Sequence, residues 1–477
     1  MDTPAVPMPK DERERRILDK LTAIQDKLLL LKRDRTQYIR SQDVIMLHDQ
    51  LVEQVRQLNE VRKGEEHKEE NRLDKVLESC LQLISLFFMT IGRTSEVPAA
   101  YALTSTVKRL LDHLTEASLF SSKDLASISS TLNRLEGILA SDESRHSPYL
   151  VELLAQRRAR CKAMIAKLRE QLERLDEPVQ VVWEQLVSIL RSMSLANTKS
   201  KFSTTEVLKL KAKLKEIEES MVDGRFLGED GEELRGSEAV AELLRRCLAW
   251  SDIVLERYVT RRTRPQASQQ QLLTFAHRKG VIPDAFKDKY NILINIRNDL
   301  EKLSITQAWS LRETDLYDFQ RQLDKIDEER VDGNWLDRDG KPAELYVQRT
   351  LLYLIRRSYG YIYFLMNSSE PVSEALLPIY NQLQTLKRCL IEVKNSGGVS
   401  SVRELYPYSM KLNSIDNMRV DGKFMVGDDI PEGQGSVSEL LAECFELNYE
   451  LRVAAEEAAE RHEDEQSQSP AVQTSAS

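Results

Sequence analysis

Glycine and proline are scarce in this sequence. The chain of 477 residues contains 17 glycines and 14 prolines, about half of the roughly 12% that these two residues make up in an average protein. Turn-rich β folds use both residues heavily, so their scarcity argues against a β architecture and favours long helices. Charged residues make up 30% of the chain and hydrophobic residues 41%, which is enough to build cores.

Cysteines are few, and their pattern excludes a disulfide framework. Their number is odd, they lie far apart, and no two have the Cys-x-x-Cys spacing of redox or zinc motifs. We expect reduced, mostly buried thiols, as in a protein of the cytoplasm or the nucleus. The five are Cys80, Cys161, Cys247, Cys389 and Cys444.

Long apolar runs and an excess of positive charge are also missing. The most apolar stretch, residues 80–91, is too short for a bilayer, which needs about 20 residues. We therefore expect no transmembrane segment, and the polar start of the chain predicts no secretion signal. The net charge of −9 argues against nucleic acid as a partner, because binding phosphate backbones requires a dominant basic face.

Motifs for catalysis, cofactors and metals are absent as well. No two of the six histidines lie three or four residues apart, as a helical zinc site requires. Gly397-Gly398 is not followed by the Gly-Lys-Ser/Thr of a phosphate loop, and residues 433–436 lack the spacing of a nucleophile elbow. The acidic runs near residues 229, 337 and 428 lack the alternation of a calcium loop. We predict no catalytic residue, no cofactor and no metal.

A five-residue motif occurs three times in the chain. Each copy reads Val-Asp-Gly, then a variable residue, then an aromatic one. A series of apolar residues with helical spacing, which we call a ladder, precedes each copy. The same ladder, without Asp-Gly, runs from Leu125 to Ala140, and a weaker copy lies at Leu51, Val55 and Leu58. The motif residues are Val222, Asp223, Gly224 and Phe226; Val331, Asp332, Gly333 and Trp335; Val420, Asp421, Gly422 and Phe424.

Two further helices accompany each ladder. A helix that opens near a proline, at residue 98, 178, 283 or 371, precedes it. A third helix follows, in three copies with a Leu-x-x-Cys step that ends at residue 80, 247 or 444. We predict an all-α fold of about five tandem three-helix repeats, the first two degenerate, with fifteen helices in an elongated or curved array.

The repeat intervals give boundaries for this array. The predicted repeats cover residues 1–92, 93–175, 176–260, 271–367 and 368–454. Residues 261–270, rich in arginine and glutamine, are predicted to form a linker. Residues 455–477 turn acidic and then rich in serine and glutamine, and we predict that they are disordered.

The Val-Asp-Gly loops are interpreted as structural. Glycine just beyond a helix accepts the left-handed conformation of a C-cap, and aspartate bonds nearby backbone N–H groups. The aromatic residue is predicted to fold back onto the bundle as a plug. In the alternative interpretation, the three loops jointly form a binding surface, since loops often carry function.

A tyrosine-rich stretch around Arg356-Arg357 allows two interpretations. It is either a well-packed third helix or a surface that binds a partner, because Tyr and Arg are enriched at interfaces. The residues proposed for that surface are Tyr346, Arg357, Tyr359 and Tyr361.

The phrase Ile-Asp-x-x-Arg-Val-Asp-Gly-x-Phe/Trp, at residues 326–335 and 415–424, resembles a conserved fungal family of uncharacterised proteins with a domain of unknown function. The resemblance implies a helical protein of the fungal cytoplasm and nucleus with no assigned activity. It supplies no catalytic residues.

Two functional hypotheses follow. The first is a non-enzymatic scaffold or adaptor that binds other proteins, since repeat arrays present extended surfaces. The second is an enzyme or small-ligand-binding protein with its site between repeats. A convergent polar pocket favours the second hypothesis, and a long shallow groove favours the first.

Overall fold

The protein is almost entirely α-helical, which confirms the predicted fold class. The computed structural model describes residues 7–63, 70–141, 147–199, 203–228, 230–263 and 282–467. This part of the chain holds fifteen α-helices and a single two-stranded sheet, in which β1 (Arg419–Val420) pairs antiparallel with β2 (Lys423–Phe424). None of the described helices is long and apolar enough to cross a membrane.

The helices follow one another in groups of three, which we call triplets one to five. The first is α1 (Glu12–Arg33), α2 (Ser41–Val61) and α3 (Arg72–Thr90); the second is α4 (Ala100–Ala117), after the short η1 (Val97–Ala99), with α5 (Ser122–Ser141) and α6 (Pro148–Glu173). The third is α7 (Glu177–Thr198), α8 (Thr204–Glu219) and α9 (Ser237–Thr263). The fourth is α11 (Asp284–Ser310), η3 (Glu313–Asp315), α12 (Leu316–Glu328) and α13 (Leu345–Asn367). The fifth is α14 (Leu377–Asn395), η4 (Val402–Leu405), α15 (Tyr406–Asp416) and α16 (Gln434–Ser467).

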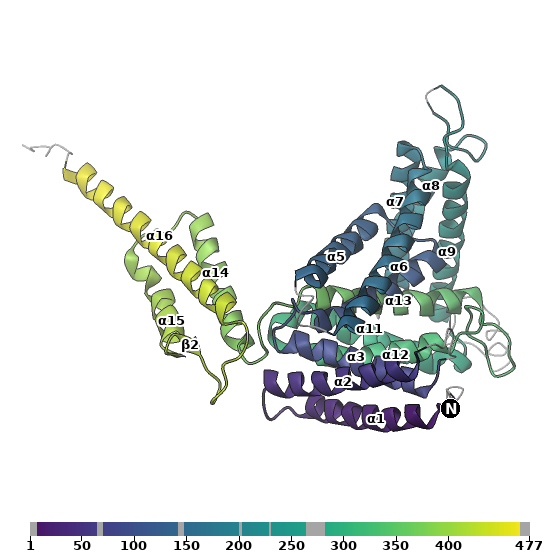
Figure 1. Ribbon diagram of the computed structural model, residues 1–477. Helices are drawn as coiled ribbons and strands as arrows, with labels where there is room; N and C mark the ends of the chain where they lie inside the picture. Colours follow the sequence, from purple (N-terminus) through teal and green to yellow (C-terminus); the bar gives the residue numbers. More distant parts are fainter. Residues whose placement is uncertain are drawn as a thin grey trace, which may run out of the picture. The chain divides into compact units, whose positions relative to one another are not determined.

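Within four of the triplets, each helix packs against the other two, as Figure 1 shows for α1 to α3 and for α14 to α16. The fourth triplet differs, because α13 packs on α12 and also on α4 and α7 of earlier triplets. The organisation of these triplets as tandem repeats stays a prediction.

Prolines mark three of the four expected helix starts. Pro178 lies in the first turn of α7, Pro283 directly precedes α11, and Pro98 lies in η1 just before α4. The expectation for Pro371 was wrong. Helix α14 begins at Leu377, with Pro378 in its first turn, because the chain first makes a turn after Pro371.

The ladders bury or half-bury their helical positions, with two corrections. In α5, Leu132 and Leu135 are buried as expected, but Ala140 is exposed and Leu139 is the residue that packs inward. The motif valines are more than half exposed, at 55%, 53% and 56%. They lie beyond the helices, where a five-residue step no longer follows helical periodicity.

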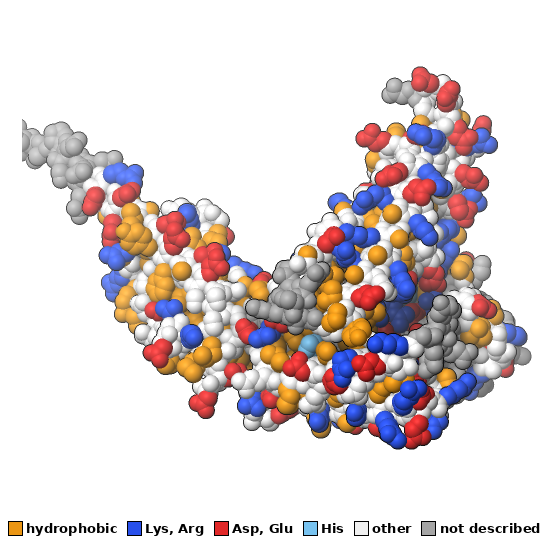
Figure 2. All heavy atoms as spheres, in the orientation of Figure 1, with side chains coloured by type: hydrophobic (Ala, Val, Ile, Leu, Met, Phe, Trp, Pro, Cys, Tyr) orange, Lys and Arg blue, Asp and Glu red, His pale blue; other side chains and the backbone are white. Residues whose placement is uncertain are grey.

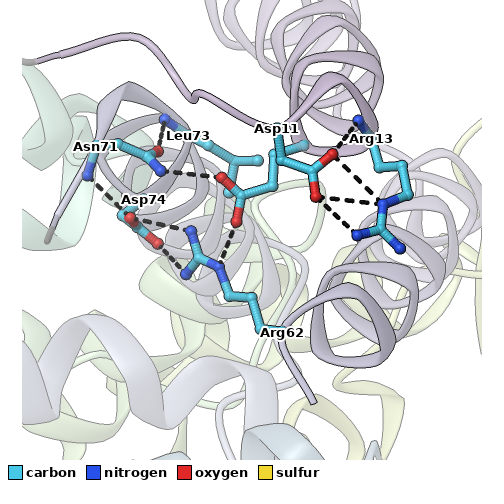
Figure 3. Close-up of polar contacts among 7 residues, drawn as sticks. Asp11, Arg13, Arg62, Asn71, Leu73 and Asp74 are labelled. Atoms are coloured by element: carbon cyan, nitrogen blue, oxygen red, sulfur yellow. Dashed lines mark hydrogen bonds and ion pairs between the residues drawn. The ribbon is translucent and has the colours of Figure 1, made fainter. Parts of the chain in front are cut away.

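A buried polar cluster joins the three helices of the first triplet (Figure 3). The carboxylate of Glu14 is 1% exposed and accepts from Arg62 Nε at 2.8 Å and from Asn71 Nδ2 at 3.1 Å. Arg62 also contacts Asp74 at 2.7 Å. These partners offset the cost of burying the Glu14 charge, so the cluster fixes α1 against the end of α2 and the start of α3.

The compact units are not consecutive repeats. Unit 1 comprises residues 1–8, 100–305 and 315–368, and unit 2 comprises residues 9–99, 306–314 and 369–477. Unit 2 therefore contains the first and the fifth triplets. Within it, Arg93 pairs with Glu432 at 2.6 Å, and the Glu374 N–H donates to Thr90 O at 2.9 Å. A Cβ atom on Gly92 would lie 2.6 Å from Ser373 N, so this junction requires glycine.

Two segments predicted to be irregular contain helix. Helix α9 runs to Thr263, so the predicted linker is helical at residues 261–263, and its remainder, 264–270, lies outside the described residues. Helix α16 continues to Ser467, which overturns the prediction of disorder from residue 455. Alanine and glutamate favour helix, and ion pairs one turn apart, such as Arg452–Glu456, support it. Residues 468–477 lie outside the described residues.

Candidate functional site

The three Val-Asp-Gly motifs form β-hairpin turns. Asp223, Asp332 and Asp421 have φ of 49°, 49° and 50°, and the glycines that follow have φ of 77°, 79° and 76°. Positive φ at both central residues defines a type I′ turn, which Asp-Gly favours. The glycines adopt the expected left-handed conformation, but the C-cap interpretation was wrong, because α8, α12 and α15 end before the motifs begin.

The aromatic residue after each turn is buried and held by the third helix of its triplet. Phe226, Trp335 and Phe424 are each less than a tenth exposed. Their backbone N–H groups donate to Ser237 Oγ, Gln348 Oε1 and Gln434 Oε1 at 2.8, 3.2 and 2.9 Å. Two hairpins belong to unit 1 and the third to unit 2, and the interpretation of the loops as a joint binding surface stays a prediction.

Half of the proposed tyrosine surface is buried. Tyr346 and Tyr359 are each 2% exposed, and their hydroxyls donate to Asn197 Oδ1 at 3.1 Å and to Asp324 Oδ1 at 2.6 Å. Their assignment to a partner surface was therefore wrong, because α13 packs on α4, α7 and α12 and has little free face. Arg357 is exposed and lies over the half-buried Tyr361 ring, 4.4 Å from its centroid.

The remaining face of α13 borders two adjoining cavities in unit 1. One has a volume of about 400 Å³ and is walled by α4, α5, α7 and α13. The other has about 210 Å³ and is walled by α4, α7, α9 and α13. Leu119, Arg191, Tyr353 and Arg356 line both. We call the two cavities together the arginine cleft; its cationic lining residues are Lys123, Arg191, Arg246, Arg349, Arg356 and Arg357.

Two carboxylates line the cleft, and both have cationic partners. Asp124 pairs with Arg191 at 2.6 Å, and Glu116 pairs with Arg330, outside the lining, at 2.5 Å. Burial alone would raise the pKa of Asp124, but Arg191 holds it below its usual range. Over the described ranges of the chain, no carboxylate forms an ion pair with the five other cationic lining residues.

The central arginines are crowded and partly desolvated. Burial lowers the pKa of Arg356 to about 10; Arg330 and Arg246 add repulsion, while Glu116 opposes it. Burial and the charge of Arg246 lower the pKa of Arg349 in the same way. Positive charges that are held close together in a partly dry site favour an anionic ligand.

Besides the ring nitrogens of His113, two buried donors of the cleft-lining residues have no acceptor among the described residues. They are Arg356 Nε and the indole Nε1 of Trp250. The Trp250 ring is 1% exposed and stacks on Tyr346 with centroids 5.7 Å apart, and the Arg349 guanidinium lies 5.8 Å from its centroid. Buried donors nearly always have partners, so these two N–H groups of the lining residues remain to be satisfied.

A histidine connects the cleft with the second hairpin. His113 lines the larger cavity, and its ring nitrogens lie 3.7 Å from Glu116 Oε2 and 3.6 Å from Asp327 Oδ2. His113 and then Arg330 lower the pKa of Glu116 to about 2. Arg330 also lies over the Trp335 ring, 5.6 Å from its centroid. Glu116 is therefore held as a carboxylate at the edge of the cleft.

Sequence reasoning missed most of this site. Its cations come from four helices that are distant in sequence, and no spacing joins them. The one available signal was the Arg356-Arg357 pair inside the tyrosine-rich stretch. Across the described part of the chain, no three His, Cys, Asp or Glu side chains are grouped so as to hold a metal ion.

Comparison with known proteins places the chain in a family. A family model described as "Protein of unknown function (DUF2408)" matches residues 172–313 and 370–473. "CUB1 family protein C30C2.08" of Schizosaccharomyces pombe is 37% identical over 455 residues, 94% of each chain. "Cu(2+) suppressing and bleomycin sensitive protein 1" of Saccharomyces cerevisiae is 36% identical over 512 residues, which cover 95% of this chain and 92% of the yeast protein. No solved structure matches. The chain belongs to the DUF2408 family, in agreement with the resemblance to fungal proteins that contain a domain of unknown function.

Proposed function

We propose that this protein is a non-enzymatic binding protein that holds a small phosphate-bearing molecule in the arginine cleft. The observation that carries the proposal is the surplus of positive charge: six cations line the cleft, and its two carboxylates already have partners. The buried donors of Arg356 and Trp250, which lack acceptors among the described residues, add to it.

Phosphate fits this lining better than other anions do. The guanidinium group is planar and forms paired hydrogen bonds with phosphate oxygens. Cavities of this size suit small molecules, whereas a nucleic-acid duplex requires an open basic face. A lining that offers positive charge and N–H donors binds an anion without attacking it, and for this reason we propose binding rather than catalysis.

The experiment that tests this function is calorimetric titration of the full chain with pyrophosphate. We expect saturable binding to the unmodified protein. Replacing Arg356 by Gln removes charge-assisted hydrogen bonds, each of which contributes about 1.5–3 kcal/mol, so affinity is expected to fall roughly tenfold to a hundredfold. The matched control is Arg169→Gln on the exposed face of α6, which is expected to keep the affinity of the unmodified protein.

Two results would count against this function. One is the absence of saturable pyrophosphate binding by the unmodified chain. The other is an equal loss of affinity in the Arg356→Gln and Arg169→Gln proteins, since a general loss of charge would then explain the binding.

The scaffold hypothesis is a second candidate, and exposed apolar side chains of the fifth triplet favour it. Val402, Tyr406 and Met410 recur at intervals of four residues along η4 and α15 and are 37%, 64% and 52% exposed. Figure 2 shows apolar side chains gathered over α14 to α16. Such a stripe suits an apolar protein partner.

The test of the scaffold hypothesis is the replacement of Tyr406 and Met410 by Ser. We expect loss of co-purifying proteins with unchanged thermal unfolding. Retention of every partner by the doubly substituted protein would exclude this stripe as the binding surface.

We also propose a reducing compartment, the cytoplasm or nucleus, as the site of action. All five cysteines are free thiols, four of them buried, and free thiols persist where glutathione keeps them reduced.

A further inference from the structure

The arginine cleft is built as two chambers that share one wall. The tryptophan chamber is the cavity of about 210 Å³ lined by Arg246, Trp250 and Arg349. The histidine chamber is the cavity of about 400 Å³ lined by His113, Lys123 and Arg357. Because each chamber has two cations of its own, each has the charge to hold a separate anionic group.

The tryptophan chamber is suited to one compact anionic group. Arg349 lies over the Trp250 ring, and Arg246 Nη2 is fixed by a hydrogen bond to Ala117 O at 3.2 Å. Trp250 Nε1 is a buried donor with no acceptor in the described part of the protein. Two guanidinium groups thus line a space large enough for a single phosphate group, and the indole N–H of a third lining residue has no partner among the described residues.

The histidine chamber offers both positive charge and apolar surface. Lys123 belongs to α5 and Arg357 to α13. The lining also includes five leucine or isoleucine residues. These apolar residues are Leu110, Leu114, Leu119, Ile128 and Leu195. A phosphate group attached to a carbon framework suits this chamber, because the framework packs on the apolar wall.

Arg356 and Arg191 connect the chambers. Both line the two cavities, but Arg191 is paired with Asp124 whereas Arg356 has no ion pair among the described residues. Arg356 is therefore placed to contact anionic groups in either chamber.

From this arrangement we infer that the ligand carries two phosphate groups on a small organic framework, one in each chamber, with Arg356 between them. The inference rests on the proposed function and goes further, because it requires two anionic groups where that function requires one. Two tethered groups bind more tightly than one, since the second binds intramolecularly.

The test compares alkane α,ω-bisphosphates of increasing chain length with the corresponding alkyl monophosphates, by calorimetric titration of the full chain. We expect one molecule per chain, and at least one bisphosphate that binds about tenfold more tightly than its monophosphate. Arg349→Gln, in the tryptophan chamber, is expected to reduce the advantage of the bisphosphate over its monophosphate. Trp250→Phe keeps the ring, removes the N–H donor and is expected to reduce the advantage in part.

The outcomes separate this inference from the proposed function. Equal affinity of every bisphosphate and its monophosphate, with both weakened by Arg356→Gln, overturns the two-phosphate ligand and leaves anion binding in place. Absence of binding by both series overturns both. If Arg349→Gln fails to fold, as its thermal unfolding would reveal, the comparison of the two series on the unmodified chain decides the matter alone.

Discussion

At the scale of single residues, the Val-Asp-Gly motif shows how far local chemistry specifies structure. The glycine at position 333 was enough to predict a positive φ. It was not enough to predict the type of turn, because both a helix C-cap and a β-hairpin use a left-handed glycine. The positive φ of the preceding Asp332 distinguishes them, and backbone angles of a non-glycine residue are not visible in a sequence. The packing of the aromatic residue was more predictable, since a large apolar side chain next to a helix end is buried most readily against the neighbouring helices.

Gly333→Val is predicted to destabilise unit 1 by roughly 1–2 kcal/mol, because a β-branched residue is strained at a φ of 79°. Denaturant unfolding followed by circular dichroism measures this. The matched control is Gly137→Val, at an exposed helical position with nothing within 4 Å of the added Cβ, where we expect almost no change. Equal stability of the two variants would contradict the strained turn.

Glu116→Gln is predicted to have a pH-dependent effect on stability. The pKa of Glu116 is lowered to about 2 from its usual value near 4.5, so its charge stabilises the folded protein above about pH 4.5. That contribution is lost as the pH falls toward 2. The difference in unfolding free energy between the two proteins should therefore be largest near neutral pH and shrink below pH 4.5. A difference that is constant with pH would show that the charge of Glu116 is not involved.

Glu116→Gln is also predicted to change the affinity of the cleft for pyrophosphate, in the opposite direction to Arg356→Gln. Removing the carboxylate of Glu116 removes a negative charge that acts on Arg356, so the cleft becomes more positive and pyrophosphate should bind more tightly. Titration at neutral pH measures this change, and weaker binding would contradict the assigned role of Glu116.

At the scale of elements, helices were predictable and their partners were not. The ladders and the Leu-x-x-Cys steps marked helical faces, and three buried thiols occupy equivalent places. Cys80, Cys247 and Cys444 donate from α3, α9 and α16 to leucine carbonyls of α1, α7 and α14 at 3.6, 3.8 and 3.5 Å. By contrast, the amphipathic pattern of α13 did not reveal that it packs on α4 and α7, because periodicity identifies a buried face but not what covers it.

These buried thiols are predicted to be unreactive in the folded protein. Burial raises the pKa of Cys80 and Cys247 to about 12, and the pKa values of Cys161 and Cys444 are also raised by burial. Reaction with a thiol reagent at neutral pH should modify Cys389, the exposed cysteine, rapidly, and the other four only after denaturation. Rapid modification of a second thiol, located by peptide mass mapping, would contradict this assignment.

At the scale of the whole molecule, the sequence indicated a series of repeats, whereas one of the two compact units combines segments from both ends of the chain. Unit 2 unites residues 9–99 with residues 369–477, and this union depends on contacts such as Arg93–Glu432 that leave no periodic trace. The arginine cleft was hidden for a related reason. In the sequence, Arg191, Arg246 and Arg349 each look like a solvated residue on a separate helix. They line one cavity because helices of three triplets pack around it.

The most direct test of the central claim, that the arginine cleft binds a phosphate-bearing molecule, is an experimental structure of the full chain with pyrophosphate. We predict phosphate density in the cleft, with oxygens within about 3 Å of the Arg356 and Arg349 guanidinium groups, the distance of a charge-assisted hydrogen bond. A well-ordered cleft without phosphate density, in crystals in which pyrophosphate is bound elsewhere on the chain, would contradict the account.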